Sequence, residues 1–363
     1  MLPQPRPGIL DIAPYVGGEA RIPGTASPIR LASNENPLGP SPAAVAAYKA
    51  AAVELHRYPD GTAAALRAAI GTAHGLEPEK IVCGAGSDEL LTLIVRGYAG
   101  PGDEVLVSRH GFLVYPIAAK SAGATPVDAP EQGLKVDVDA LLGRVSARTR
   151  LVLIANPSNP TGSYLPPAEM ERLHAGLPEH VLLVIDSAYA EYVEERDYEP
   201  GAVLVRAHSN VVMTRTLSKI YGLASLRLGW AYAPPAIVHV LNRLRGPFNV
   251  PGPTQAAGIA ALQDQGFVAT CRKETARWRA WLAEAIRGVG LVAHPSVCNF
   301  LLVEFPRDAG RDAAAALAFL KSRGILVRGM GAYQLPQCLR ITIGTAAAMR
   351  ATAAALADFR KGA

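Results

Sequence analysis

The fold is decided by the stretch from Arg150 to Tyr189, which contains RLVLIAN (150–156), PPAEMERLHAGL (166–177) and VLLVIDSAY (181–189). The first and third segments are short and apolar, and the second has the length and mixed polarity of a helix. The apolar segments show no strict alternation of apolar and polar residues, which is typical of strands buried on both faces. This order therefore predicts parallel strands joined by a helix that covers their sheet.

The same alternation continues on both sides of this stretch. Strands are expected at 81–85, 104–108 and 211–218, and helices at 87–98 and 112–123. Short apolar strands that alternate with helices are typical of a mainly parallel sheet with helices on both faces. The chain is therefore predicted to have an α/β fold.

Beyond about residue 250 the pattern changes. Two strand candidates, FLLVEF (300–305) and CLRITIG (338–344), lie beside helices expected at 311–322 and 345–360. They predict a second, smaller α+β unit. The N-terminal segment is rich in proline and glycine, which predicts an irregular arm. We therefore expect an N-terminal arm (1–30), a large domain (31–250) and a small C-terminal domain (251–363).

The composition excludes several classes of protein. Half of the 363 residues are hydrophobic and 18% are charged, which excludes a disordered chain and allows a large buried core. The net charge is only +5 and no run of Lys or Arg occurs, so nucleic-acid binding is not expected. The four cysteines form no CxxC pair, so no metal site or disulfide framework is expected. There is no leader-like N-terminus and no long apolar stretch, so we expect no membrane association and a cytoplasmic location.

Candidates for chemistry follow the predicted strands, because ligands of open α/β sheets bind at the carboxyl ends of strands. The first strand is followed by Gly84-Ala85-Gly86-Ser87-Asp88, at the start of a predicted helix. Glycines let the backbone approach a ligand, and the free N–H groups of Ser87 and Asp88 would attract a phosphate. An ordinary helix cap explains the same residues and is, taken alone, the simpler interpretation.

The central strand is followed by the loop Asn156-Pro157-Ser158-Asn159-Pro160-Thr161-Gly162. Two Asn-Pro steps constrain this loop and thereby fix where the asparagine side chains point. Asn159 would then hydrogen-bond to a bound ring. Turn formation alone is the competing interpretation, although this combination of residues is far rarer by chance than a single glycine motif.

The next strand ends in Asp186, and Tyr189 follows it in the loop. A carboxylate at the end of an apolar strand costs desolvation free energy unless it meets a cationic group. A protonated ring nitrogen would satisfy Asp186. An exposed carboxylate that caps a turn is an equally good explanation.

The strand near residue 215 is followed by Thr216-Leu217-Ser218-Lys219, and Arg227 lies eight residues later. A lysine beside cationic or apolar neighbours can have a lowered pKa and form a Schiff base. Ser218 and Arg227 would both contact a phosphate, Arg227 in a bidentate manner. The competing interpretation is a surface lysine near a structural arginine. Together, the strand-end residues supply an amine, an acid for a ring nitrogen and phosphate donors, which are the parts of a pyridoxal phosphate site.

Several of these motifs resemble those of the fold-type I aminotransferases, and the resemblance covers nearly the whole chain. They are Asn-Pro-x-Asn-Pro-Thr-Gly, Asp-x-Ala-Tyr, and Thr-Leu-Ser-Lys with an arginine eight residues on. Three others are similar to those of histidinol-phosphate aminotransferases, namely Asn34-Glu35-Asn36-Pro37, Arg57-Tyr58-Pro59-Asp60 and CLRITIGT (338–345). The resemblance implies a mainly parallel seven-stranded sheet in the large domain, a smaller α+β domain and pyridoxal 5′-phosphate as cofactor.

The resemblance also implies roles for residues of this chain. Lys219 would hold the cofactor as a Schiff base and move a proton, and Asp186 would pair with the ring nitrogen. Asn159 and Tyr189 would contact the 3′ oxygen, and Phe112, where tyrosine is frequent, would stack on the ring. The phosphate would be held by Ser87, Asp88, Ser218 and Arg227.

The substrate-binding residues follow from the same resemblance. Arg340 matches the family's arginine for the anionic group of the substrate, and Arg328 resembles a second one. Asn34 is expected in the same site, and Tyr15 either closes over the substrate or anchors the arm. In this family the tyrosine of Arg-Tyr-Pro-Asp reaches the cofactor phosphate of the other subunit, so Tyr58 implies a homodimer with shared active sites.

The reaction implied by the resemblance is transfer of the amino group of histidinol phosphate to 2-oxoglutarate, in histidine biosynthesis. An aromatic amino-acid aminotransferase and a decarboxylase of the phosphothreonine type share much of this pattern and stay open as alternatives. A cofactor-sensing regulator is least expected, because Asn34-Glu35-Asn36-Pro37 begins too near the start to leave room for a DNA-binding domain.

Overall fold

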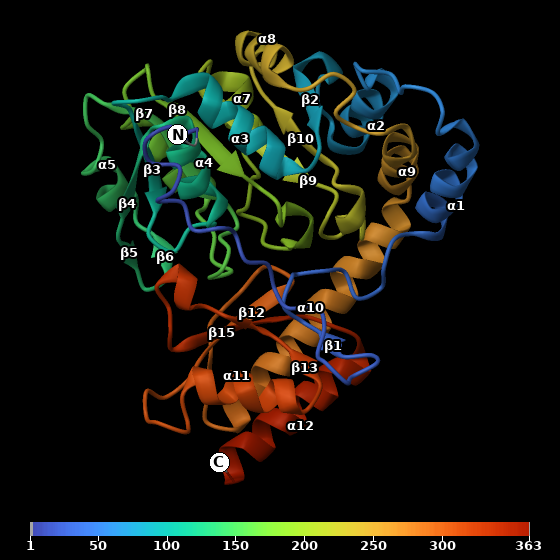
Figure 1. Ribbon diagram of the computed structural model, residues 1–363, viewed down its shortest axis with the longest axis vertical. Coiled ribbons are helices and arrows are strands. Elements are labelled where there is room, and N and C mark those ends of the chain that lie inside the picture. Colours follow the sequence, from blue (N-terminus) through green and yellow to red (C-terminus); the bar gives the residue numbers. More distant parts are fainter. Residues whose placement is uncertain (1–2, 363) are drawn as a thin grey trace.

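The computed structural model describes residues 3–362, which form two sheets with their helices (Figure 1). A seven-stranded sheet occupies the upper part of Figure 1 and a four-stranded sheet the lower part. The long helix α10 (Gln265–Gly288) runs from one part to the other. Within the described residues, no helix is long and apolar enough to cross a lipid bilayer.

The seven-stranded sheet has the order β2-β10-β9-β8-β7-β3-β4, and only β10 runs antiparallel to its neighbours. In sheet order the strands are β2 (Ile81–Gly84), β10 (Gly229–Tyr232), β9 (Val211–Thr216), β8 (Leu182–Asp186), β7 (Thr149–Ala155), β3 (Glu104–Ser108) and β4 (Thr125–Ala129). The predicted α/β fold with a mainly parallel seven-stranded sheet is therefore confirmed.

Strands β4 and β10 are not predicted from the sequence. The segment TPVDA of β4 contains a proline and an aspartate, which are tolerated because β4 is an edge strand paired only with β3. The segment GWAY of β10 is too short to give a pattern. Its place is decided by pairing with β2 and β9 on its two sides.

Side chains of the central strands alternate between two apolar cores, one on each face of the sheet. On β8, Leu183 and Ile185 enter one core, and Leu182 and Val184 enter the other. The second core is covered by α3 (Ser87–Tyr98), α4 (Val114–Ala122) and α8 (Pro235–Leu244). The first is covered by α2 (Ala64–His74), α5 (Val138–Leu142), α6 (Pro167–Ala175), α7 (Ala202–Ala207) and α9 (Gly252–Gln263).

The four-stranded sheet is antiparallel, with the order β11-β12-β15-β14. Its strands are β11 (Val292–Ala293), β12 (Phe300–Glu304), β15 (Cys338–Thr342) and β14 (Arg328–Gly329). Helices α10, α11 (Ala313–Ser322) and α12 (Ala346–Gly362) pack with it around a separate apolar core. Strands β12 and β15 and helices α11 and α12 lie where the sequence predicts them.

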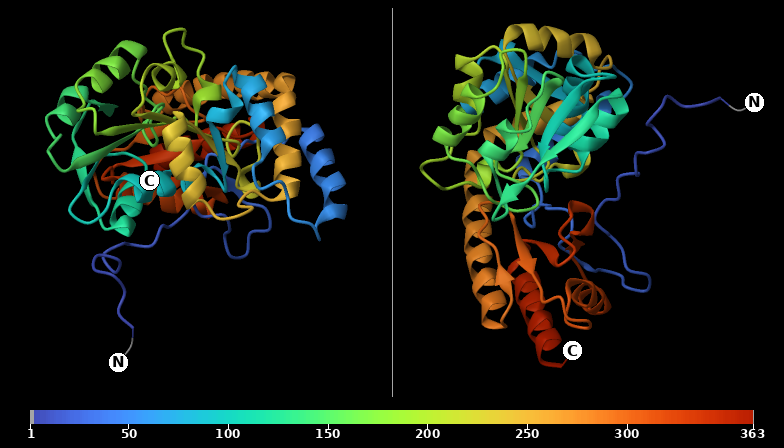
Figure 2. Two further views of the ribbon diagram at one scale, coloured as in Figure 1. Left: turned by 90° about the horizontal axis from the view of Figure 1, so that it is seen from above. Right: turned by 90° about the vertical axis from the view of Figure 1, so that its left-hand side faces the viewer.

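The N-terminal segment, residues 3–28, consists of turns and extended chain without a helix or strand. Figure 2 shows its first residues extending away from the body of the protein. It leads into β1 (Ile29–Arg30), which pairs in parallel with β13 (Ile325–Leu326). The other short elements are α1 (Pro42–Ala51), β5 (Glu131–Gln132), β6 (Lys135–Val136), η1 (Ala52–Glu54), η2 (Pro78–Lys80), η3 (Ala190–Tyr192), η4 (Ala224–Leu226) and η5 (Gly331–Tyr333).

The division of the chain into an arm and two domains, at residues 30 and 250, stays a prediction. Helix α9 lies beyond residue 250 but packs on α1 and α2, beside the larger sheet. Strand β1 lies near residue 30 and pairs with β13, beside the smaller sheet. The chain therefore crosses between the two sheets close to both of the expected boundaries.

Candidate active site

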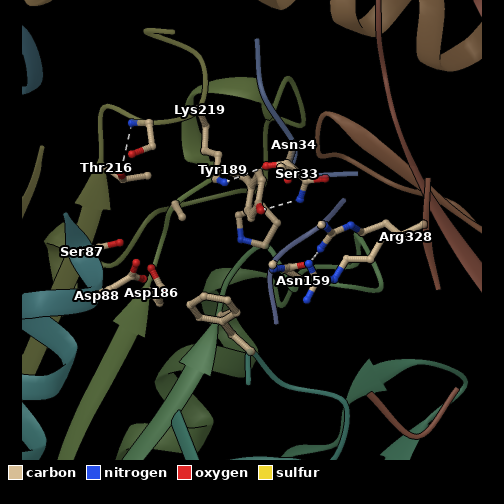
Figure 3. A pocket seen from close by; sticks show the side chains of 18 of the residues that line it. Ser33, Asn34, Ser87, Asp88, Asn159, Asp186, Tyr189, Thr216, Lys219 and Arg328 are labelled. Atoms are coloured by element: carbon tan, nitrogen blue, oxygen red, sulfur yellow. Dashed lines mark hydrogen bonds between the residues drawn. The ribbon is translucent and has the colours of Figure 1, made fainter. Parts of the chain in front are cut away.

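A cavity lies where β7, β8 and β9 end, and the N-terminal segment and the four-stranded sheet contribute to its wall (Figure 3). All the site residues expected from the sequence line this cavity, except Tyr58. They are Tyr15, Asn34, Ser87, Asp88, Phe112, Asn159, Asp186, Tyr189, Ser218, Lys219, Arg227, Arg328 and Arg340. The carboxyl ends of parallel strands meet at one edge, which is why residues from distant parts of the sequence come together there.

Lys219 follows the end of β9 and points into the cavity (Figure 3). Its Nζ lies 3.5 Å from the carbonyl oxygen of Ser33 and 5.7 Å from the centre of the Tyr189 ring. Burial, and after it the guanidinium of Arg340, lower the pKa of this amine to about 8. An amine with such a pKa is partly unprotonated near neutral pH, so it is suited to act as a nucleophile and a base.

Asp186 ends β8 with its carboxylate buried. The hydroxyl of Tyr115 donates to Oδ2 at 3.0 Å, and that of Thr214 donates to Oδ1 at 3.1 Å. Burial raises the pKa of the carboxyl to about 6, although both hydrogen bonds act against this rise. Because both donors are neutral, a cationic group beside Asp186 would offset the desolvation of its charge.

The loop between β7 and α6 presents Asn159 to the cavity. Asn156 fixes the base of this loop, because its side chain exchanges two hydrogen bonds with the backbone of Leu165, at 3.1 and 2.9 Å. The oxygen of the Asn159 amide accepts a hydrogen bond from Arg340. The Asn159 amide is therefore held between the sheet edge and the four-stranded sheet.

Tyr189 is held by Asn34, whose Nδ2 donates to the phenol oxygen at 2.7 Å (Figure 3). The φ angle of Asn34 is +58°, a conformation that asparagine tolerates better than most residues. Thr342 secures this backbone, since its Oγ1 accepts from the N–H of Asn34 and donates to Oδ1, both at 3.0 Å. Asn34 thus links the phenol of Tyr189 to the four-stranded sheet.

The start of α3 forms a cradle at the far end of the cavity. Gly86 is the N-cap residue with a φ angle of +87° and provides no side-chain cap, so Ser87 and Asp88 lie in the first turn. Arg227 closes the cradle, because its guanidinium donates to Oγ of Ser218 at 3.3 Å and to the carboxylate of Asp88 at 3.0 Å. A Cβ atom at Gly86 would lie 2.5 Å from Nη2 of Arg227, so glycine lets this guanidinium approach the start of α3 closely.

Phe112 lies on the cavity wall between two tyrosine rings. It meets Tyr115 edge-on with the ring centres 5.7 Å apart, and Tyr15 edge-on at 6.4 Å. Tyr115 therefore contacts both Phe112 and Asp186. Sequence reasoning missed this tyrosine, although its position three residues after Phe112, at the start of a helix, was a usable signal.

Arg328 and Arg340 lie directly opposite each other on β14 and β15. Only 9% and 4% of their surfaces are exposed. Arg328 donates to the carbonyl oxygen of Val16 at 2.8 Å, and Arg340 donates to that of Ala32 at 2.9 Å, while the buried Nε of Arg340 has no hydrogen-bond partner among the described residues. Like charges opposed across two strands repel each other, so this pair predicts an anionic ligand between them.

Tyr58 does not join the cavity. Its side chain is 83% exposed and stacks on Phe248, with the ring centres 4.6 Å apart. Its role in a second subunit therefore stays a prediction. Sequence reasoning also missed Ser33, Thr216 and Tyr333, which line the cavity. Thr216 is the first residue of the lysine motif, whereas no sequence signal marked Ser33 or Tyr333.

The residues of the cavity fit pyridoxal 5′-phosphate. Lys219 offers an amine with a lowered pKa, and Asp186 offers a buried carboxylate whose charge is not balanced by its neutral donors. The start of α3, where the Arg227 guanidinium approaches Gly86, can receive a phosphate that accepts hydrogen bonds from the N–H groups of the first turn. An amine, an acid and a phosphate cradle are the groups that this cofactor requires.

Comparison with known proteins identifies similar chains. Residues 26–356 match the family described as aminotransferase class I and II. The chain is 61% identical to a histidinol-phosphate aminotransferase of Rhodospirillum centenum over 99% of each chain, and 56% identical to that of Paramagnetospirillum magneticum over 98% of each. It superimposes on a crystal structure of histidinol-phosphate aminotransferase from Sinorhizobium meliloti in complex with pyridoxal-5′-phosphate with a TM-score of 0.91, at 32% identity, covering 99% of this chain and 98% of that one.

Proposed function

The chain belongs to the class I and II aminotransferases, in the histidinol-phosphate aminotransferase family, and from this premise we propose that it transfers the amino group of histidinol phosphate to 2-oxoglutarate. The products are imidazole acetol phosphate and glutamate, and the reaction belongs to histidine biosynthesis in the cytoplasm. The observation that carries the choice of substrate is the buried, opposed pair Arg328 and Arg340, because a phosphate group between them would neutralise their repulsion.

Bound pyridoxal 5′-phosphate supplies an electron sink that stabilises negative charge at the α-carbon of the substrate. Asp186 holds a proton at the ring nitrogen, because its buried charge favours a cationic neighbour. Lys219 takes the proton from the α-carbon, for which its pKa of about 8 is well suited. Both groups lie at the ends of neighbouring parallel strands, so the backbone of one sheet fixes their separation.

The other residues of the cavity orient the reactants. Asn159 and Tyr189, each held by its own hydrogen bond, would contact the 3′ oxygen of the bound ring. Phe112 would stack on one face of the ring. The N–H groups of Ser87 and Asp88 and the side chains of Ser218 and Arg227 would hold the phosphate of the cofactor. Arg340, Arg328, Tyr15 and Asn34 bind the substrate.

The functional unit in this proposal is a homodimer with shared active sites. Tyr58 supports it, because its exposed ring stacks on the exposed ring of Phe248, and aromatic side chains are enriched at interfaces. In the dimer, the hydroxyl of Tyr58 would reach the cofactor phosphate of the partner subunit. Sedimentation of the holoenzyme tests this part of the proposal, and a monomer that retains full activity contradicts it.

A substrate panel tests the reaction itself. Initial rates of the purified holoenzyme are measured with 2-oxoglutarate and either histidinol phosphate or phenylalanine as amino donor. We expect kcat/KM to be roughly 100-fold higher for histidinol phosphate, because charged hydrogen bonds to the phosphate contribute about 1.5–3 kcal/mol each. Equal or higher kcat/KM for phenylalanine favours an aromatic amino-acid aminotransferase. Release of carbon dioxide without any need for 2-oxoglutarate favours a decarboxylase.

A further inference from the structure

Tyr333 lies in the loop between the two opposed arginines, which connects β14 to β15. The loop is held by its own backbone, since Met330 accepts hydrogen bonds from the N–H groups of Tyr333 and Leu335, at 2.9 and 3.1 Å. Gln334 has a φ angle of +60° and turns the chain back toward β15. The position of Tyr333 is therefore fixed by the turn rather than left to a mobile loop.

Tyr333 is also held by contacts to its ring and to its backbone carbonyl. It packs in a small apolar cluster with Leu302 and Leu335, and only 2% of its surface is exposed. On the other side, Nδ1 of His110 lies 2.7 Å from the carbonyl oxygen of Tyr333. A carbonyl oxygen only accepts hydrogen bonds, so the proton is on Nδ1 of His110. Because His110 lies two residues before Phe112, this bond joins the wall of the substrate site to the expected ring-stacking residue.

The side chain of Tyr333 lines the same cavity as both cations of the substrate site. Burial raises its pKa, and the guanidinium of Arg340, followed more weakly by that of Arg328, acts in the opposite direction. Two neighbouring cations attract the lone pairs of the phenol oxygen. The hydroxyl proton is therefore directed away from the two guanidinium groups and is available to an anionic ligand in the cavity that all three side chains line.

We propose that Tyr333 is a substrate-binding residue whose hydroxyl donates a hydrogen bond to the phosphate group held between Arg328 and Arg340. The inference rests on the proposed function and deepens it by naming a residue that selects the substrate class. A phosphate monoester has three terminal oxygens, whereas a carboxylate has two. The two arginines satisfy a carboxylate in full, and the hydroxyl of Tyr333 serves the additional oxygen of a phosphate.

The test uses the holoenzyme with Tyr333→Phe, which keeps the ring and its packing and leaves the backbone bond to His110 in place. We expect the KM for histidinol phosphate to rise about tenfold, with kcat little changed, because one hydrogen bond to a charged group is lost. The dissociation constant of inorganic phosphate, measured by calorimetry on the same holoenzyme, rises by the same factor. The half-reaction with glutamate, a substrate with carboxylates only, keeps its wild-type concentration dependence.

The matched control is Tyr232→Phe, which removes the hydroxyl of another buried tyrosine. Tyr232 lies on β10, does not line the cavity, and donates a hydrogen bond to Glu77. This variant should leave the KM for both amino donors and the dissociation constant of inorganic phosphate unchanged. If Tyr333→Phe weakens the binding of histidinol phosphate and of glutamate equally, or changes the binding of neither, the inference is overturned. In both cases the hydroxyl does not distinguish a phosphate from a carboxylate. If the wild-type enzyme does not use histidinol phosphate as amino donor, but Tyr333→Phe still weakens phosphate binding, the proposed function is wrong and the inference about the phosphate site is supported.

Discussion

The floor and the wall of the cavity are built in different ways. The floor consists of Asp186, Lys219 and Asn159, which follow the neighbouring strands β8, β9 and β7 of one sheet. The wall consists of Arg328 and Arg340 with the aromatic residues around them, and it depends on chain segments far apart in sequence. Arg328, for example, bonds to the backbone of a residue 312 positions earlier. The positions of the floor residues are therefore fixed by the pairing of their strands. The wall forms only when the N-terminal segment packs against the smaller sheet.

The largest expected effect concerns the floor. Lys219→Ala removes the amine that we propose moves the proton, so we expect the rate of transamination to fall by roughly 10⁴-fold or more. The absorption band of the bound cofactor, which depends on its link to this amine, should disappear as well. Lys273→Ala, which changes an exposed lysine elsewhere, serves as the control and should keep both the rate and the band. Transaminase activity retained by Lys219→Ala contradicts the assignment of the floor.

The next prediction compares variants of the two arginines and tests whether a change in the wall alters the cofactor bound at the floor. Arg328→Gln should raise the KM for histidinol phosphate about 10- to 100-fold and leave the cofactor spectrum unchanged, because the side chain of Arg328 donates its hydrogen bond to Val16 of the N-terminal segment rather than to Asn159. Arg340→Gln should raise the KM similarly and also shift the spectrum, because Arg340 holds Asn159 and lowers the pKa of Lys219. Absorption spectra and steady-state kinetics of both variants decide this. Identical spectra in the two variants would show that Arg340 does not influence the cofactor through Asn159 or Lys219.

The smallest effect concerns a support beneath the floor. Tyr115→Phe removes one of the two hydrogen bonds to the Asp186 carboxylate, so the pKa of Asp186, already raised to about 6, should rise further. A carboxyl whose pKa in the folded state exceeds its ordinary value of 3.8 makes the folded protein less stable as the pH rises from that value through the folded-state pKa. We therefore expect the variant without cofactor to lose about 1–2 kcal/mol of unfolding free energy at pH 7 and less at pH 4.

Urea unfolding of the wild type and of Tyr115→Phe at both pH values measures this difference. Thr214→Val removes the other hydrogen bond to Asp186 and should show the same dependence on pH. A loss of stability that is equal at pH 4 and pH 7 would mean that Tyr115 contributes by packing alone. Weaker binding of the cofactor, by up to about tenfold, should accompany the loss at pH 7.

The sequence predicted the floor well, for a physical reason. Buried parallel strands give uninterrupted apolar runs, and the polar residues directly after them must lie at one edge of the sheet. Asp186 and Lys219 were therefore found together without knowledge of any contact. Tyr115 was missed because its bond to Asp186 depends on how α4 packs on the sheet.

The wall was predicted only in part. Arg340 and Arg328 were identified by resemblance, but their direct opposition comes from the pairing of β14 with β15, and β14 is too short to be seen in the sequence. Tyr333 lies in a loop whose shape depends on one positive φ angle and a bond from His110. The role of Tyr58 depends on a second subunit.

By itself, then, the sequence determined the α/β fold, the strand ends and the set of polar groups at those ends that we propose bind the cofactor, because each of these follows from local apolar runs and the residues next to them. The tertiary structure alone decided how the two arginines face each other, which tyrosine joins them and how the N-terminal segment meets the smaller sheet. These contacts join residues hundreds of positions apart. They form only after two sheets and the helix between them have packed, so no local pattern in the chain records them.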